Sequence, residues 1–132
     1  MNIFEENLDK WLKKDIGISL EDTDFFDQYS FDVKIVILKM FVQWACESQN
    51  IANIELGRKR VSHLNKKWLQ DHLIDAANDA LDLSDEWEYR RFVELVIVAV
   101  PELKKEAVEI GMQSNNADIR EASDDYKNSE RL

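Results

Sequence analysis

The chain has 132 residues, a formal net charge of −10 and an apolar fraction of 45%. This length and composition predict one globular domain that is large enough to bury a hydrophobic core. Because Cys46 is the single cysteine, no disulfide can form within the chain, and the low number of glycines and prolines argues against a turn-rich β-sandwich.

Sequence signals for export or membrane insertion are not found. Residues 1–10 are acidic rather than basic and no apolar run follows them, so we expect no secretory signal. The longest apolar stretch, residues 33–46, contains Lys34, Lys39 and Gln43 and is too short to span a bilayer. We therefore expect a cytoplasmic protein that does not enter the membrane.

Apolar residues have helical spacing through nearly the whole chain. In the first predicted helix they share one face and Gly17 follows as a helix end; the members of that face are Phe4, Leu8, Trp11 and Leu12. Residues 18–28 are expected to form a loop with a short helical turn. Ser30 caps the next predicted helix, which runs to about Gln49 and is apolar almost all round, so we place it in the centre of the domain.

The remaining chain predicts further helices. Residues 51–82 form one long helix or two, with Gly57 and Asn65 as candidate break points. The ends of the later helices are marked by residues that favour such positions, namely Ser84, Pro101, Gly111, and either Asn116 or Ser114. The sequence therefore predicts an all-α fold: a single compact helical domain of six or seven mostly antiparallel helices over 1–127, with a frayed tail at 128–132.

The helix predicted to end at residue 82 has one acidic side. At about 100° per residue, its aspartates fall together, opposite the leucines and alanines of its core-facing side; they are Asp71, Asp75, Asp79 and Asp82. If the helix is continuous from Leu64, Trp68 projects on the acidic side as an aromatic anchor. If it breaks near Asn65, Trp68 turns into the core and the aspartates are simply solvated.

A second helix face, within residues 85–100, combines aromatic and charged side chains. Trp87, Arg91, Glu94 and Val98 align along it, and Arg90 has the spacing of an ion pair with Glu94. Tryptophan and arginine contribute strongly to protein interfaces. The alternative is that Trp87 lies flat over a neighbouring helix with Arg91 stacked on it.

Residues 58–67 carry a charge of +5 in an otherwise acidic chain. Their basic members are Arg58, Lys59, Arg60, Lys66 and Lys67. We expect this basic patch to pair with carboxylates of the same chain, or to mediate self-association, rather than to hold a phosphate or an acidic peptide. The acidic remainder disfavours nucleic-acid binding and speeds the encounter with a basic protein.

Signatures of catalysis or cofactor binding are missing from the sequence. His63 and His72 are the only histidines, and no Cys/His cluster has zinc-ligand spacing. A metal-dependent hydrolase would have to use Asp71, His72 and Asp75, which is a poor set of ligands. Cys46 lies in the apolar central segment, where a small buried residue is expected. We expect neither an enzyme nor a cofactor.

Two stretches carry a family resemblance. Residues 82–91 read DLSDEWEYRR, and residues 111–125 read GMQSNNADIREASDD. The second is similar to the loop and second-helix pattern of HEAT-like proteins, although no period repeats three times and no solenoid is expected. Together the stretches resemble small, acidic, all-helical bacterial immunity proteins encoded beside polymorphic or contact-dependent toxins. The resemblance covers the last third to half of the chain and implies an inhibitor of one cognate toxin domain, often a nuclease.

The leading interpretation is an immunity protein that binds and neutralises a cognate basic, nuclease-type toxin domain through an acidic face containing tryptophan. The partner-binding residues expected from the two helix faces are Trp68, Asp71, Asp75, Asp79, Asp82, Trp87 and Arg91. The alternative is a non-catalytic scaffold or regulatory protein that self-associates through Trp87, Arg91 and Val98.

Overall fold

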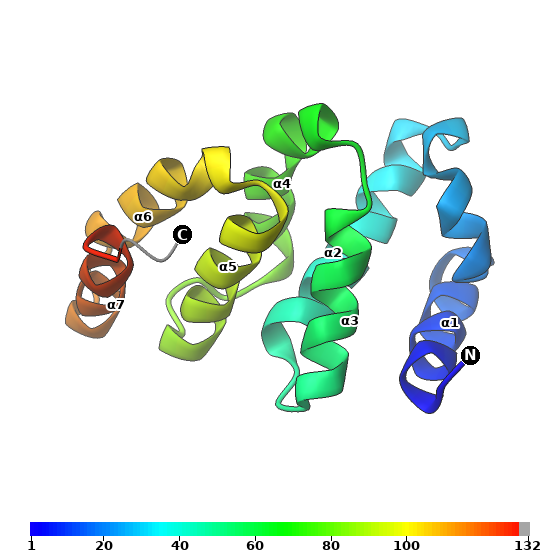
Figure 1. Ribbon diagram of the computed structural model, residues 1–132, viewed down its shortest axis with the longest axis horizontal. Coiled ribbons are helices and arrows are strands. Elements are labelled where there is room, and N and C mark those ends of the chain that lie inside the picture. Colours follow the sequence, from blue (N-terminus) through cyan, green and yellow to red (C-terminus); the bar gives the residue numbers. More distant parts are fainter. Residues whose placement is uncertain (130–132) are drawn as a thin grey trace.

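The computed structural model describes residues 1–129 of the chain. Within them it contains seven α-helices, two 3₁₀-helices and no strand, so the predicted all-α fold is confirmed. The elements are α1 (Ile3–Ile16), η1 (Glu21–Gln28), α2 (Phe31–Glu47), α3 (Ile51–Ser62), α4 (Lys66–Ala80), α5 (Glu86–Ala99), η2 (Pro101–Leu103), α6 (Lys104–Met112) and α7 (Ala117–Lys127). The helices follow one another along the longest axis, from α1 at one end to α6 and α7 at the other (Figure 1).

Helix α2 is the central element of the fold, as its apolar sequence predicts. It contacts α1, η1, α3, α4 and α5, and its side chains Ile37, Leu38 and Val42 are fully buried. Helix α5 takes the same role for the C-terminal part, because it packs against α2 and α3 as well as α6 and α7. Every α-helix contributes to one hydrophobic cluster, for example through Leu12, Phe41, Val61, Leu73, Phe92, Ala107 and Ile119.

The chain divides between α3 and α4 at Asn65, and the alternative break at Gly57 is wrong. The Asn65 side chain accepts a hydrogen bond of 3.0 Å from the backbone N–H of Trp68 and so caps α4. Gly57 lies inside α3 against α2, where a Cβ atom would come within 2.8 Å of the carbonyl oxygen of Phe41. This close approach of two helix backbones is what requires a glycine here.

Most of the other predicted helix ends agree with the structure. Gly17 ends α1 in the left-handed region at φ 69°, Ser30 caps α2 by accepting from the N–H of Val33, and Asn116 rather than Ser114 caps α7. Each of these ends depends on hydrogen bonds within a few residues, which is why the sequence reveals them.

Two predicted ends are wrong. The cap of α5 is Asp85, which accepts a hydrogen bond of 3.0 Å from the N–H of Glu88, whereas Ser84 donates its hydroxyl to Asp82. Gly111 does not end α6, which continues to Met112. A Cβ at Gly111 would collide with the ring of Tyr89, so this glycine permits close packing of α6 on α5.

Two neighbouring pairs, α2–α3 and α6–α7, are antiparallel hairpins. The hydroxyl of Ser123 in α7 donates to the carbonyl of Val108 in α6, and Asn53 in α3 donates to Ser48 at the end of α2. Among the described residues no helix is long and apolar enough to cross a membrane. Residues 130–132 of the predicted tail lie outside the described part of the chain.

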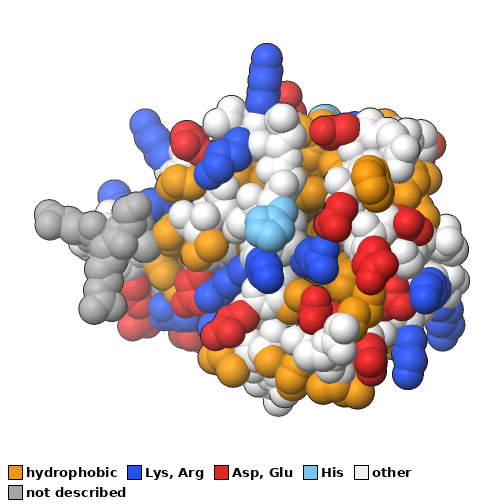
Figure 2. Space-filling view, turned by 45° about the vertical axis from the view of Figure 1, so that its right-hand side comes forward, with side chains coloured by type: hydrophobic (Ala, Val, Ile, Leu, Met, Phe, Trp, Pro, Cys, Tyr) orange, Lys and Arg blue, Asp and Glu red, His pale blue; other side chains and the backbone are white. Residues whose placement is uncertain are grey.

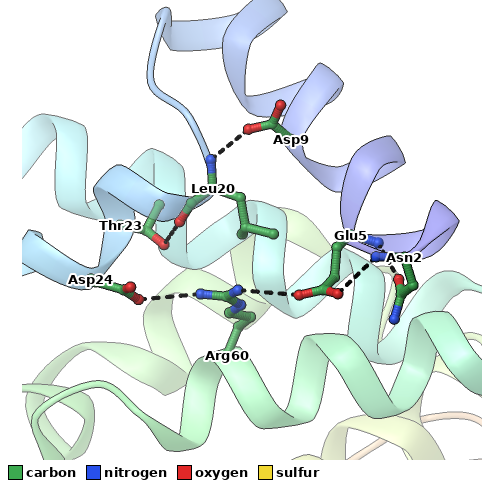
Figure 3. A network of polar contacts seen from close by, with 7 residues as sticks. All are labelled: Asn2, Glu5, Asp9, Leu20, Thr23, Asp24 and Arg60. Carbon is green, nitrogen blue, oxygen red and sulfur yellow. Dashed lines mark hydrogen bonds and ion pairs between the residues drawn. The ribbon is translucent and has the colours of Figure 1, made fainter.

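Helix α1 is joined to the next segment by a buried carboxylate. Asp9 accepts a hydrogen bond of 2.7 Å from the backbone N–H of Leu20 (Figure 3). It also forms an ion pair of 2.8 Å with Lys13. The contacts with Lys13 and with the Leu20 N–H hold the pKa of Asp9 below its ordinary value. The hydroxyl of Thr23 donates to the carbonyl of Leu20, which completes the turn.

Candidate protein-binding surfaces

Three of the four predicted aspartates form an exposed line on α4, which we call the acidic ridge. Asp71, Asp75 and Asp79 are exposed and follow one another at intervals of one helix turn. The opposite side of α4 is buried through Leu69 and Leu73. Asp79 forms an ion pair of 3.4 Å with Lys39 of α2, whereas Asp71 and Asp75 have no ion-pair partner within residues 1–129. The ridge is therefore a surface of largely uncompensated negative charge.

Asp82 is not part of the acidic ridge, contrary to the prediction. Helix α4 ends at Ala80, and Asp82 lies in the turn that leads to α5. Its carboxylate accepts a hydrogen bond of 2.5 Å from the hydroxyl of Ser84 and one of 3.0 Å from the Ser84 N–H. These bonds lower the pKa of Asp82, so this carboxylate organises the turn rather than extending the ridge.

Trp68 is partly buried rather than fully projecting, because α4 begins at Lys66 and not at Leu64. Leu64 is buried in the connection between the helices, in agreement with the predicted alternative of a break near Asn65. Trp68 does have the angular position of Asp75 and Asp79 at about 100° per residue. Its indole, however, meets the ring of Phe26 in η1 at 4.9 Å and packs against the core.

The head of the acidic ridge is occupied by four rings in edge-to-face or tilted contact, which we call the aromatic row. Its rings follow in the order Phe26, Trp68, His72 and Phe31, with centroid separations of 4.9, 4.7 and 5.1 Å. Phe31 is 54% exposed, so it presents the largest apolar surface of the row. We did not predict a role for Phe31 from the sequence, although a phenylalanine directly after the cap Ser30 is a possible signal.

The predicted second face, which carries Trp87, Arg91, Glu94 and Val98, lies on α5, and we call it the α5 strip. It is exposed at its two apolar ends. Trp87 is 48% exposed and Val98 is 54% exposed. The guanidinium of Arg91 lies 4.1 Å from the centroid of the Trp87 ring and forms an ion pair of 3.1 Å with Glu94. The stacking of Arg91 on Trp87 agrees with the alternative stated above, although the indole remains accessible.

The expected pair between Arg90 and Glu94 does not form. Arg90 instead contacts Glu86 at 3.2 Å and Asp125 of α7 at 3.0 Å, because α7 packs on that side of α5. Glu94 accepts from Arg58 of α3 at 2.6 Å, which is possible because α3 packs on the other side. The charges of α5 are therefore largely neutralised by neighbouring helices.

The two arginines of the basic patch pair with carboxylates of the same chain, as expected, whereas Lys59 and Lys67 form no ion pair within residues 1–129. Besides the contact of Arg58 with Glu94, Arg60 bridges Asp24 of η1 at 3.3 Å and Glu5 of α1 at 3.8 Å (Figure 3). Lys66 donates to the carbonyl of Ala99 at 3.4 Å. On the face shown in Figure 2, acidic and basic side chains are interspersed with apolar patches.

The cysteine and the two histidines are not brought together into a reactive or metal-binding site. Cys46 is buried, and burial raises the pKa of its thiol. His72 belongs to the aromatic row, while His63 is exposed. No group of three metal-ligating side chains comes together among the residues that the structure describes.

A tryptophan-lined groove between α1, α2 and α3 was not anticipated from the sequence. Trp11 and Trp44 line it, with Asp15 and Glu47 beside them. Its only sequence signal is the apolar face of the first helix, which includes Trp11; in the structure this side chain is 49% exposed.

Comparisons with known proteins identify no relative of this chain. No family model matches the chain, and neither a curated protein nor a solved structure matches it.

Proposed function

We propose that this protein is a binding module, an immunity protein that neutralises a cognate basic toxin domain of the nuclease type. The acidic ridge would dock on the cationic surface of the toxin, and Phe31 of the aromatic row would supply apolar contact. The observation that carries this proposal is that Asp71 and Asp75 are exposed on successive turns of α4 without an ion-pair partner in the described chain.

The proposed contact has a direct electrostatic basis. A nuclease holds phosphates with cationic side chains, so carboxylates presented by a rigid helix compete for the same site. Like charges one turn apart destabilise an isolated helix by about 0.2–0.5 kcal/mol per pair. A cationic partner turns this repulsion into attraction and accelerates the encounter. The function requires no catalytic group or cofactor, and it would be exercised in the cytoplasm.

The test is a binding measurement with the purified product of the neighbouring toxin gene. The double variant Asp75→Lys/Asp79→Lys should bind at least about tenfold more weakly and with a smaller salt dependence, because both substitutions reverse charge at the interface. The matched control is Glu106→Lys/Glu121→Lys, which makes the same charge change on exposed positions of α6 and α7.

The comparison of the two double variants separates local contact from overall charge. Retained affinity in the control and lost affinity in the ridge variant support docking through α4. Unchanged affinity and salt dependence in the ridge variant remove this surface from the interface. An equal loss in both variants assigns the effect to net charge and also contradicts the proposal.

A second candidate function is self-association as a non-catalytic scaffold or regulatory protein. The exposure of Trp87 and Val98 on one strip of α5 favours it, since both side chains are apolar and accessible. Sedimentation at increasing concentration tests this function. A dimer that Trp87→Ala dissociates supports it, whereas a strict monomer at high concentration contradicts it.

A further inference from the structure

The groove between α1, α2 and α3 is lined by two indoles together with apolar and polar side chains. It has a volume of about 410 Å³ and is lined by Trp11, Trp44 and the buried Met40. The two indole centroids are 6.4 Å apart and their planes meet at 66°, so the rings form a corner rather than a closed stack. Such a corner exposes aromatic surface on two sides of a bound group.

A cationic side chain of the same helix already lies against one of the two indoles. The ammonium group of Lys14 lies 5.2 Å from the centroid of the Trp11 ring, within the range of a cation–π contact. Lys14 is an exposed residue of the same helix, one position after Lys13. Lys14 therefore covers part of the Trp11 ring, but it does not line the groove itself.

Two carboxylates lie beside the indoles in the groove lining. Asp15 and Glu47 line the groove, and neither has an ion-pair partner in the described part of the chain. Burial, together with the neighbouring carboxyl group of Glu88, raises the pKa of Glu47 above its ordinary value. Glu47 is the last residue of α2, where the helix dipole adds further negative potential.

Polar atoms of the groove residues are also left without partners. The indole N–H of Trp44 and the side-chain oxygen of Asn53 are buried and have no hydrogen-bond partner among residues 1–129. Buried polar groups are normally satisfied, so these two atoms are exceptions among the residues that line the groove.

We propose that the groove formed by Trp11, Trp44, Asp15 and Glu47 binds an arginine side chain presented by another protein. A guanidinium is planar, so it stacks on an indole while its N–H groups donate to a carboxylate. The corner of the two tryptophans supplies the stacking surface, and Glu47 supplies the acceptor at the end of α2.

This inference is independent of the proposed function, because it concerns a different surface. Its partner can be any protein that presents an arginine side chain. The groove and the acidic ridge are nevertheless connected along α2. Lys39, which pairs with Asp79 of the ridge, is one helix turn before Gln43 and two turns before Glu47 on the same side of α2. A single basic partner can therefore contact both surfaces.

The test uses N-acetyl-L-arginine amide as the probe and the four indole N–H resonances as reporters in two-dimensional NMR. The resonances are assigned by single Trp→Phe variants. We expect saturable shifts of the Trp11 and Trp44 signals, with a dissociation constant in the millimolar range. The uncharged isostere N-acetyl-L-citrulline amide should bind at least about tenfold more weakly, because it keeps the shape but loses the charge. Trp87 is the internal control, since it is a half-exposed indole outside the groove that also carries a cation–π contact, with Arg91.

Two variants complete the test. Glu47→Gln should weaken binding of the arginine probe at least about fivefold, because it removes the accepting carboxylate without changing the side-chain volume. Glu55→Gln, at an exposed position of α3, should leave it unchanged. The proposal is overturned by unsaturable shifts, by equal binding of citrulline amide, by equal shifts of Trp87, or by an unaffected Glu47→Gln variant. A capped amino acid reports on the groove alone, so failure here leaves the ridge proposal to its own test.

Discussion

Arg58 and Glu94 lie 36 positions apart in the sequence, and a hydrogen bond of 2.6 Å from the guanidinium to Oε1 joins them. The other carboxylate oxygen of Glu94 accepts 2.7 Å from the hydroxyl of Tyr126, and Arg91 contacts Oε1 at 3.1 Å. Burial opposes ionisation of Glu94, but the bonds from Tyr126 and Arg58 hold its pKa below its ordinary value. One carboxylate thus connects α3, α5 and α7.

The first prediction concerns this connection. Glu94→Gln should lower the free energy of unfolding by about 1–3 kcal/mol, because it leaves the partly buried guanidinium groups of Arg58 and Arg91 without their anionic partner. Urea denaturation measures the change. Glu121→Gln, an exposed position of α7, is the control and should change stability by less than about 0.5 kcal/mol. Equal stabilities of the two variants would contradict the role given to Glu94.

The second prediction concerns the contact of α3 with α2. Gly57→Ala should destabilise the protein by about 1–3 kcal/mol despite the better helix propensity of alanine, because the added Cβ meets the α2 backbone at Ala45 and Phe41. Glu55→Ala, exposed on the same helix, is the matched control. Thermal unfolding followed by circular dichroism compares them, and a stabilised Gly57→Ala protein would show that the helices do not approach so closely.

The third prediction is a pH dependence that originates at Asp9. Because the folded-state pKa of Asp9 is lowered, its ionised form contributes stability above the ordinary carboxyl pKa of about 3.9, and this contribution is lost as the pH falls through the lowered value. Asp9→Asn removes that contribution. The stability difference between the wild-type protein and Asp9→Asn should therefore be largest near pH 7 and shrink in acid, as measured by denaturation at several pH values. A constant difference would exclude this titration.

The fourth prediction concerns the four tryptophans. Trp11 and Trp87 are about half exposed, whereas Trp44 and Trp68 are partly buried. Acrylamide quenching should therefore separate the tryptophan fluorescence into an accessible class, which is quenched readily, and a protected class, which is quenched weakly. Trp11→Phe or Trp87→Phe should each reduce the accessible class. A Trp68→Phe variant should reduce the protected class instead. Uniform quenching of all four indoles would contradict these exposures.

The sequence anticipated those features that depend on neighbours in the chain. The left-handed turn at Gly17 and the cap at Ser30 need only nearby N–H and carbonyl groups, so the local residue types predict them. The apolar circumference of α2 likewise predicts its central position. It is harder to predict which of two adjacent residues caps a helix. Ser84 and Asp85 are both of types that favour the cap position, and Asp85 is the cap in the structure.

Contacts between distant helices were not predictable in the same way. Arg90 has the correct spacing for an ion pair with Glu94, yet it pairs with Asp125 of α7. Glu94 pairs instead with Arg58 of α3. Gly57 and Gly111 resemble helix breakers in the sequence, but each lies where another helix comes too close for a side chain. The exposure of Trp11 and its meeting with Trp44 also depend on how α1 docks.

The helical class, most helix ends and the spacing of Asp71, Asp75 and Asp79 follow from local periodicity and capping, which act over a few residues. The packing of η1 over Trp68, the removal of Asp82 from the acidic ridge and the groove beside Trp44 follow from the docking of separate elements. Docking depends on the shape and charge of segments that are far apart in the chain. Helix periodicity describes only near neighbours and therefore does not predict how such segments pack together.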